Sequence, residues 1–163
     1  PLGTGQIFVR SPMLFMDYVG PQTDHTAAVR DGDWLSVRDM GYVDPHGFLC
    51  LVGRENRMVV TQGKNLFPEE LEAVLMTCPG IAQASVHGVP DPIRGQQVVA
   101  VIQTHPTDIQ VTTQQLSAAC RAQLEGYKVP KRFLICADWP FTASGKTDHL
   151  ALAKALPCLP TLP

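Results

Sequence analysis

A short loop in the last quarter of the chain combines a lysine with residues that suit contact with an anion. Residues 140–147 read PFTASGKT, and proline, glycine and small hydroxyl side chains are typical of a tight turn that leaves room for a ligand. A helical pattern follows directly, so we expect Lys146 to stand near a helix N-terminus, where anions are stabilised. The pattern therefore indicates a lysine that contacts a phosphate or a carboxylate.

Two other interpretations of Lys146 differ in strength. A P-loop is excluded, because that motif needs a glycine five residues before its second glycine and Pro140 stands at that position. A solvated lysine at the start of a helix stays open, and these residues alone favour it. The rest of the chain has to decide between a lysine that contacts an anion and a solvated lysine.

The composition indicates a globular protein with no electrostatic preference for nucleic acid. Of 163 residues, 45% are hydrophobic and the net charge is −2, which argues against disorder and against a nucleic-acid surface. No apolar run approaches the ~20 residues that a membrane-spanning helix needs. The five cysteines lack CxxC spacing and mostly lie in apolar runs, so we expect reduced core residues of a cytoplasmic protein. The five histidines are scattered singly, so we expect no metal site.

Residues 1–55 show short strands and turns without a clear helix. Candidate strands lie at 6–10, 34–37 and 48–52, and Asp44-Pro45-His46-Gly47 between two apolar pairs predicts a hairpin. The segment has too few apolar residues to form a core of its own.

Residues 56–156 have the pattern of an α+β domain. Pro68 suits the first position of a helix whose apolar residues repeat at i, i+3, i+4 and i+7 from Leu71. Thr112 and Gln115 predict a capping box for a second helix, and Gly126 predicts its end. Strands are expected at 58–61, 82–86, 98–102 and 133–136, and a last helix at 148–156. We therefore expect a small mixed sheet with helices packed on it.

The joint between these segments is a polar run, residues 53–57. It is either an ordinary loop or a hinge between two bodies that move relative to each other. Residues 157–163 contain three prolines, and we expect a loose tail.

Taken in order, many short motifs of this chain resemble one family. The motifs are Gly32-Asp33, Asp39-Met40-Gly41-Tyr42, Gly47-Phe48, Gly53-Arg54, Gly63-Lys64-Asn65, Pro68-Glu69-Glu70-Leu71-Glu72, Cys78-Pro79-Gly80-Ile81, Val89-Pro90-Asp91-Pro92, Tyr127-Lys128-Val129-Pro130-Lys131 and Ser144-Gly145-Lys146. The ordered set resembles the C-terminal third of the adenylate-forming superfamily, which contains acyl- and aryl-CoA synthetases, luciferases and nonribosomal peptide adenylation domains. The match spans roughly residues 3–156 and looks nearest to fatty-acyl or aryl-CoA ligases.

The resemblance implies a two-step ligase. A carboxylic acid reacts with ATP to give an acyl-adenylate and pyrophosphate, and a thiol then displaces AMP to give a thioester. CoA is the implied thiol, with a carrier-protein pantetheine as the alternative, and Mg²⁺ is expected to accompany ATP on the large N-terminal domain. Residues 1–55 would be the strand-rich end of that domain, residues 56–156 its mobile C-terminal lid, and the chain alone is expected to be inactive. A non-catalytic interaction module that kept the lid fold is a further alternative.

The resemblance also assigns roles to individual residues. Lys146 would be the adenylation lysine, placed between the carboxylate and the phosphate. Asp33, in Asp31-Gly32-Asp33 where the family usually has Thr-Gly-Asp, would hold the ribose hydroxyls, and Arg54 would lie near the same ribose. Asn56 falls at the hinge, where the family usually carries Asp or Lys.

Three further residues would face the thiol substrate. Gly63 would line the loop that approaches the pantetheine channel, where many relatives also carry a lysine that this chain replaces with Val60. Lys128 and Lys131 would meet phosphates of CoA, or they would equally be solvated residues beside a strand.

Overall fold

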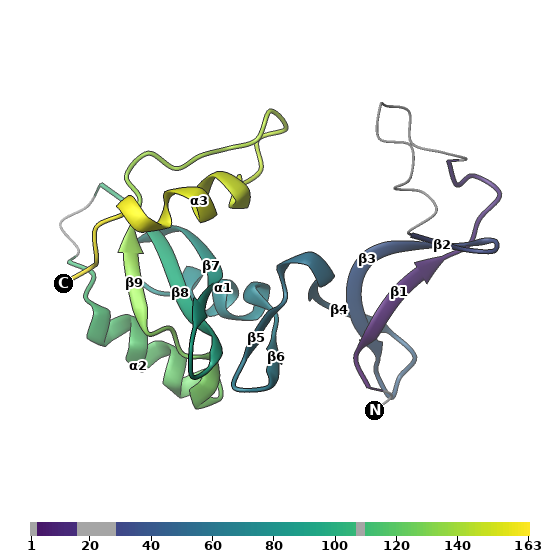
Figure 1. Cartoon of the computed structure of the whole chain (residues 1–163), viewed down its shortest axis with the longest axis horizontal. Helices are drawn as coiled ribbons and strands as arrows, with labels where there is room; N and C mark the ends of the chain where they lie inside the picture. Colours follow the sequence, from purple (N-terminus) through teal and green to yellow (C-terminus); the bar gives the residue numbers. More distant parts are fainter. Residues whose placement is uncertain (1–2, 16–28, 107–109) are drawn as a thin grey trace. The chain divides into compact units, whose positions relative to one another are not determined.

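A computed structural model describes residues 3–15, 29–106 and 110–163. The chain divides into two compact units, Pro1–Arg57 and Met58–Pro163 (Figure 1). The division falls after Arg57, two residues beyond the boundary expected from the sequence and at the end of the polar run that the sequence indicated as a joint.

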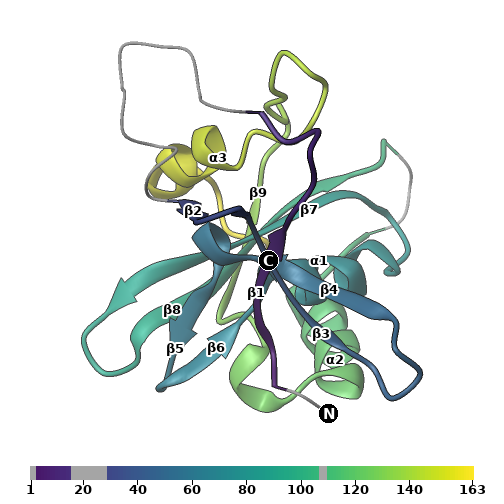
Figure 2. The same ribbon diagram turned by 90° about the vertical axis from the view of Figure 1, so that its right-hand side faces the viewer.

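The first unit is an antiparallel sheet with a short 3₁₀ turn after it (Figure 2). Its elements are β1 (Gly5–Val9), β2 (Arg30–Asp31), β3 (Trp34–Val43), β4 (Leu49–Arg54) and η2 (Glu55–Arg57). Strand β3 pairs with all three other strands. The predicted hairpin between β3 and β4 is confirmed, because Asp44 Oδ1 accepts hydrogen bonds from the N–H groups of His46 (2.9 Å) and Phe48 (2.8 Å).

Little of this unit is buried by the unit itself. Among its described residues, the buried apolar side chains are Val29 and Leu35, whereas Phe48 and Leu51 are 69% and 66% exposed. The shortage of core residues expected from the sequence is therefore seen in the structure.

The second unit is a mixed sheet covered by three helices, and the predicted α+β class is confirmed. Its elements are β5 (Val59–Thr61), β6 (Lys64–Leu66), α1 (Pro68–Met76), β7 (Ile81–Asp91), β8 (Gly95–Thr104), α2 (Thr113–Gln123), η3 (Gly126–Lys128), β9 (Arg132–Ile135), α3 (His149–Ala155) and η4 (Leu156–Cys158). The strand order is β6-β5-β8-β7, and β9 runs parallel to β8 while the other pairs are antiparallel.

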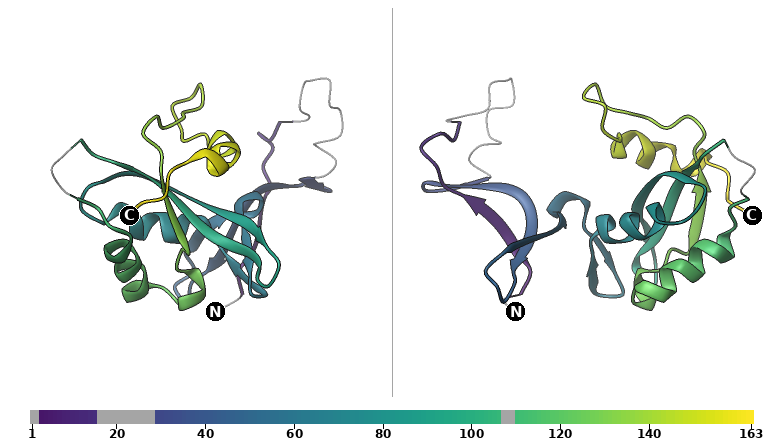
Figure 3. Two further views of the ribbon diagram at one scale, coloured as in Figure 1. Left: turned by 60° about the vertical axis from the view of Figure 1, so that its left-hand side comes forward. Right: turned by 180° about the vertical axis from the view of Figure 1, so that it is seen from behind.

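Strand β8 is buried on both faces because successive side chains of a strand point to opposite sides. Val98, Ala100 and Ile102 belong to one apolar cluster, which also contains Leu71, Val74 and Leu75 of α1 and Leu116 and Cys120 of α2. Val99 and Val101 belong to another, which contains Leu152 of α3. Helices α1 and α2 therefore cover one face of the sheet and α3 covers the other (Figure 3).

The helix boundaries follow the sequence signals at most ends. Pro68 opens α1, and the capping box between Thr112 and Gln115 is present in α2. The end of α2 differs from the prediction, because the helix ends at Gln123 with Leu124 as its C-cap, and Gly126 opens η3. Leu124 takes an extended backbone conformation (φ −126°, ψ 155°) and packs against the core, which ends the helix before the glycine is reached.

The predicted loose tail is wrong. Leu162 is buried within the α1–α2 cluster. Its N–H donates to Phe133 O (2.8 Å), and the N–H of Ile135 donates to Pro160 O (2.9 Å). Strand β9 has an edge whose backbone groups need partners, and residues 160–162 supply them.

This packing predicts that the end of the chain contributes to stability. Leu162→Ala is expected to lower the free energy of unfolding of the second unit by about 2–3 kcal/mol, because it leaves a cavity in the core. Urea unfolding followed by Trp139 fluorescence measures the change. Thr161→Ala, at an exposed position of the same segment, is the control and should change it by less than about 0.5 kcal/mol. An equal effect of both variants would contradict the buried position of Leu162.

Candidate functional site

Lys146 lies in a closed turn between β9 and α3. Phe141 and Thr147 form an isolated antiparallel bridge. Within it, the N–H of Thr142 donates to Lys146 O (2.7 Å), and the N–H of Gly145 donates to Thr142 O (2.9 Å). Gly145 has φ +77°, a left-handed conformation that glycine adopts without strain. The glycine next to the lysine is therefore required by the turn itself.

The base of this turn is attached to the core of the second unit. Trp139 is 7% exposed, and its indole Nε1–H donates to Thr147 Oγ1 at 3.1 Å. The N–H of Asp148 donates to Pro140 O (2.9 Å), which holds the two ends of the loop together. Figure 1 shows the loop projecting beyond α3.

The lysine side chain itself is exposed. Lys146 takes part in no salt bridge or side-chain hydrogen bond among the described residues, and only its backbone is bonded within the turn. Helix α3 begins shortly after it, at His149, and Asp148 caps that helix by accepting from the N–H of Ala151 (2.9 Å). A rigid base and an unoccupied ammonium together suit contact with an external anion.

The structure does not bring Asp33 and Arg54 together. Asp33 lies in the turn before β3, while Arg54 ends β4 opposite Asp39. At about 3.3 Å per residue, β3 rises about 20 Å between Asp33 and Asp39. Arg54 instead forms an ion pair with Asp39, with 3.0 Å between Nε and Oδ1. Asp33 and Arg54 are thus too far apart to hold the same ribose.

Asp39, the ion-pair partner of Arg54, was not identified by the sequence analysis. It follows Arg38, whose φ of +57° is left-handed and unusual for a residue other than glycine. The Arg38 N–H donates to Ser36 Oγ (3.1 Å), which supports this conformation. Val37-Arg38-Asp39 therefore has the backbone of an X-Gly-Asp motif with arginine in place of glycine. Counting back from the hairpin would pair Arg54 with Arg38, and the register shift between Met40 and Gly41 brings Asp39 opposite Arg54 instead.

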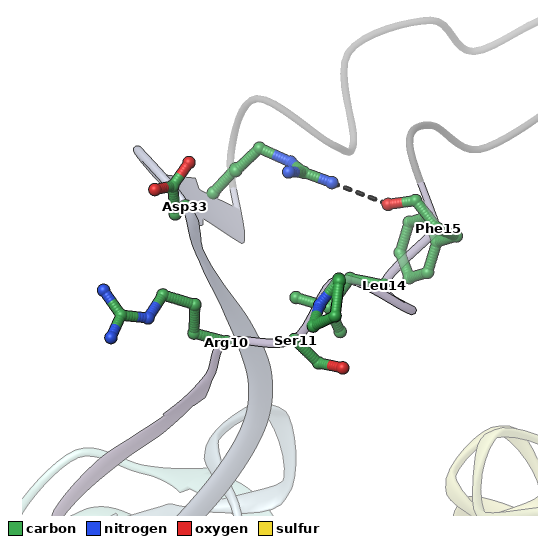
Figure 4. Close-up of a pocket in the computed structure, with 7 residues that line it drawn as sticks. Arg10, Ser11, Leu14, Phe15 and Asp33 are labelled. Carbon is green, nitrogen blue, oxygen red and sulfur yellow. Dashed lines mark hydrogen bonds between the residues drawn. The ribbon is translucent and has the colours of Figure 1, made fainter.

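Asp33 lines a separate pocket in the first unit (Figure 4). The pocket has a volume of about 460 Å³, and its charged residues are Arg10, Arg30 and Asp33. One Arg30 nitrogen, Nη2, donates to Phe15 O at 2.6 Å, and the Arg10 guanidinium lies 4.8 Å from the centre of the Trp34 ring. Each arginine thus contacts a neighbouring residue, Arg30 the pocket residue Phe15 and Arg10 the ring of Trp34.

Asn56 lies in the middle of η2, next to the division between the units. Its side chain is exposed, and the neighbouring Glu55 accepts a hydrogen bond from Gln6 Nε2 (3.1 Å) on β1. The part of the turn before Asn56 is therefore bonded to the first unit. The hinge assigned to Asn56 stays a prediction.

Gly63 lies in the two-residue turn between β5 and β6. Gln62 has φ +53° and Gly63 has φ +71°, so both central residues are left-handed, as in a type I′ hairpin. A Cβ added at Gly63 would meet no atom within 4 Å. The glycine is thus needed for its backbone conformation and not for space among the described atoms of this chain.

The two lysines expected near CoA phosphates differ sharply. Lys128 Nζ contacts both carboxylate oxygens of Glu70 at 2.9 and 2.8 Å, lies 3.9 Å from Glu125, and is only 16% exposed. Burial lowers the pKa of Lys128, but the hydrogen bond and charge of Glu70 outweigh it, so the pKa is raised above 10.5. Lys131 is exposed and takes part in no salt bridge among the described residues. Lys128 is therefore committed to an internal ion pair, and Lys131 remains available.

Other chemistry in the described residues is limited. They contain no group of three or more His, Cys, Asp or Glu side chains that could hold a metal ion. Among them, no helix is both long and apolar enough to cross a membrane. The cysteines are free, and burial raises the pKa of the Cys120 thiol to about 11. Cys158 differs from the expected core position, because it is exposed.

Comparison with known proteins shows what the second unit is similar to. Residues 70–146 match the family model described as AMP-binding enzyme C-terminal domain. An uncharacterized acyl–CoA ligase of Bacillus subtilis is 44% identical over 93% of this chain and 29% of its own length. A 2-succinylbenzoate–CoA ligase of a Geobacillus strain is 32% identical over 96% of this chain and 32% of its own length. The chain thus spans less than a third of the length of these relatives.

Solved structures show the same fold. An o-succinylbenzoate CoA synthetase from Bacillus subtilis, in complex with an acyl-adenylate intermediate, matches with a TM-score of 0.84 at 30% identity over 93% of this chain and 31% of the other. An amide bond synthetase from Marinactinospora thermotolerans matches with a TM-score of 0.83 at 31% identity over 93% of this chain and 31% of the other. The expected resemblance to adenylate-forming enzymes is confirmed.

The Lys128–Glu70 pair generates a prediction about stability. Lys128→Met is expected to lower the free energy of unfolding at pH 7 by about 1 kcal/mol, because it removes a partly buried charge-assisted hydrogen bond to a half-exposed carboxylate. Because the pKa of Lys128 is raised in the folded state, this contribution is complete below pH 10.5 and is lost as the pH rises through the higher, folded value. Urea denaturation at pH 7 and above pH 10.5 measures it, and Lys131→Met, at an exposed site, serves as the control. Equal effects of the two variants would contradict a stabilising ion pair between Lys128 and Glu70.

Proposed function

We propose that this chain is the C-terminal part of a ligase that joins a carboxylic acid to a thiol, because residues 70–146 match the family model described as AMP-binding enzyme C-terminal domain. In the first step a carboxylate oxygen bonds to the α-phosphorus of ATP and pyrophosphate leaves. In the second step the thiol sulfur bonds to the acyl carbon, AMP leaves and the thiol proton is released. The proposed thiol is CoA, since the relatives in the comparison include CoA ligases of several acids.

The observation that carries the proposal is the exposed Lys146 on a turn whose base is fixed to the core. A carboxylate and a phosphate repel each other as they approach. An ammonium held between them offsets that repulsion, and it does so most effectively where water is excluded. The hydrogen bonds within the turn hold the backbone of Lys146 before the substrate arrives, so less freedom has to be lost in the transition state.

We assign the ribose contact to Asp39 and Arg54 and no longer to Asp33. The assignment is supported by the 3.0 Å ion pair, which holds the two side chains together where the end of β4 lies beside the middle of β3. An aspartate fixed in this way can accept hydrogen bonds from two neighbouring hydroxyls of a ribose. The guanidinium of Arg54 is 61% exposed and retains donors for an oxygen of the nucleotide.

The second step needs a different set of groups. Asn56 is the proposed pivot that lets the lid present a second face, and the β5–β6 turn at Gly63 is the proposed contact with the pantetheine arm. Lys131 is the remaining candidate for a CoA phosphate, because Lys128 is held by Glu70. Mg²⁺ would accompany ATP and neutralise its phosphates, bound mainly by parts of the enzyme outside this chain. A cytoplasmic location would suit the supply of ATP and CoA and the free cysteines.

Three alternatives keep the same fold. A carrier-protein pantetheine would serve as the thiol in place of CoA, and an amine would serve in an enzyme like the amide bond synthetase that this chain is similar to. A non-catalytic module that kept the lid fold is the third alternative, and the exposed Lys146 on a fixed turn supports the catalytic proposal over it.

The first test concerns Lys146. In the complete protein, Lys146→Ala is expected to reduce acid-dependent ATP–pyrophosphate exchange by about 10²–10³-fold, because one transition-state contact to the phosphate is lost. Lys154→Ala removes the same charge from the exposed face of α3 and is expected to leave exchange within about twofold. Unchanged exchange in the Lys146 variant would refute the catalytic assignment.

The second test separates Asp39 from Asp33. Asp39→Asn is expected to raise the KM for ATP in the exchange reaction by about tenfold or more, because a charged acceptor for the ribose is lost. Asp33→Asn is expected to leave the KM unchanged, although it makes the same chemical change in the turn before the same strand. A raised KM in the Asp33 variant alone would restore the original assignment.

A further inference from the structure

A buried serine joins strand β7 to helix α3 through two histidines. Ser85 is fully buried, and its Oγ lies 2.9 Å from His87 Nε2 and 2.8 Å from His149 Nδ1. The two imidazole rings are 6.4 Å apart between centroids and meet edge to face at 60°. His87 belongs to the same strand as Ser85, whereas His149 is the first residue of α3.

The strand register explains why these groups meet. Ser85 is paired with Val101 and His87 with Val99, so both lie on the face of the sheet that α3 covers. The buried residues around α3 on this face are otherwise apolar or aromatic apart from one thiol, Cys136. A buried hydroxyl without partners would be costly there, but each side of Ser85 Oγ has an imidazole nitrogen within hydrogen-bond distance.

The hydroxyl has one proton, which constrains the arrangement. Ser85 Oγ–H can donate to the bare nitrogen of one imidazole, while Oγ accepts from the N–H of the other. Such a chain has a direction and fixed distances, unlike the apolar contact that Leu152 makes one turn later in α3. The hydrogen bond to His149 therefore fixes the position of the first residue of α3 relative to the sheet.

Helix α3 begins directly after the turn of residues 140–148 that carries Lys146, which we call the lysine turn. Only Thr147 and Asp148 separate Lys146 from His149, and the N–H of Asp148 is bonded to Pro140 O. Besides this bond, the buried Trp139 holds the incoming side of the turn and the Ser85–His149 hydrogen bond holds the outgoing side. Loss of the bond to His149 is expected to loosen the outgoing side.

We propose that Ser85, acting through His149, is a positioning residue that fixes the outgoing side of the Lys146 turn. Ser85 and Lys146 are not in contact, and the effect passes through the first residue of α3. The structural part of the proposal concerns this chain alone, and its catalytic consequence rests on the function proposed above.

Hydrogen–deuterium exchange of the 163-residue chain tests the structural part. In Ser85→Ala, the amide N–H groups of Gly145 and Lys146 are expected to exchange about tenfold faster, because the hydrogen bond that restrains the turn is gone. His149→Ala should give the same change, and His149→Gln, whose amide can still reach the serine hydroxyl, should restore part of the protection. Unaltered exchange in both alanine variants would overturn the proposal.

Ser117→Ala is the matched control for a merely structural effect. Ser117 is a buried serine of the same unit, but it lies on α2, across the sheet from α3. The Ser117→Ala variant is expected to show the same amide exchange in the Lys146 turn as the unmodified chain. Equal loosening of the turn by Ser117→Ala would show a general loss of stability and would refute a specific role for Ser85.

The catalytic consequence is measured in the complete protein. Ser85→Ala is expected to lower kcat for ATP–pyrophosphate exchange by about tenfold with the KM for ATP unchanged, because lysine placement matters in the transition state and not for nucleotide binding. If Lys146→Ala leaves exchange intact, the proposed function fails while the amide-exchange result still stands. If the turn loosens in Ser85→Ala and kcat does not fall, the catalytic part of the proposal is refuted.

Discussion

Burial of β8 on both faces is the constraint on which the arrangement of the second unit depends. An unbroken apolar run gives each face of the strand a row of valine, alanine or isoleucine side chains. Each row needs a cover, so α1 and α2 pack on one side and α3 on the other. To cover the second face, the chain passes from β9 to α3, and the lysine turn is the exposed connection between these two elements.

The lysine turn combines a rigid base with an unoccupied tip. Its backbone is closed by its own hydrogen bonds, and its ends are held by an indole, a backbone pair and the histidine that opens α3. Restraint of this kind is built into the fold and does not have to be supplied by the substrate. The same logic applies to Asp39 and Arg54, whose mutual ion pair holds both side chains before any nucleotide binds.

The sequence predicted what local patterns determine. Pro68, the capping box at Thr112 and the apolar run of β8 each encode their own element, and the structure contains all three. It did not predict what depends on distant partners. The packing of Leu162 depends on the open edge of β9, which local composition does not show. Asp39 was not identified from the sequence because Arg38 before it adopts a left-handed backbone conformation, which a glycine would have indicated and an arginine does not. Ser85 and His149 are far apart in sequence and meet only through the register of β7.

The segment that covers β9 also has a consequence for the behaviour of the protein at high concentration. A strand edge with unpaired backbone groups can recruit an edge of another molecule and start aggregation. Here residues 160–162 cover that edge with their own hydrogen bonds, so the backbone groups of β9 on this side already have partners. Self-association through the edge of β9 is therefore disfavoured by a segment of the same chain.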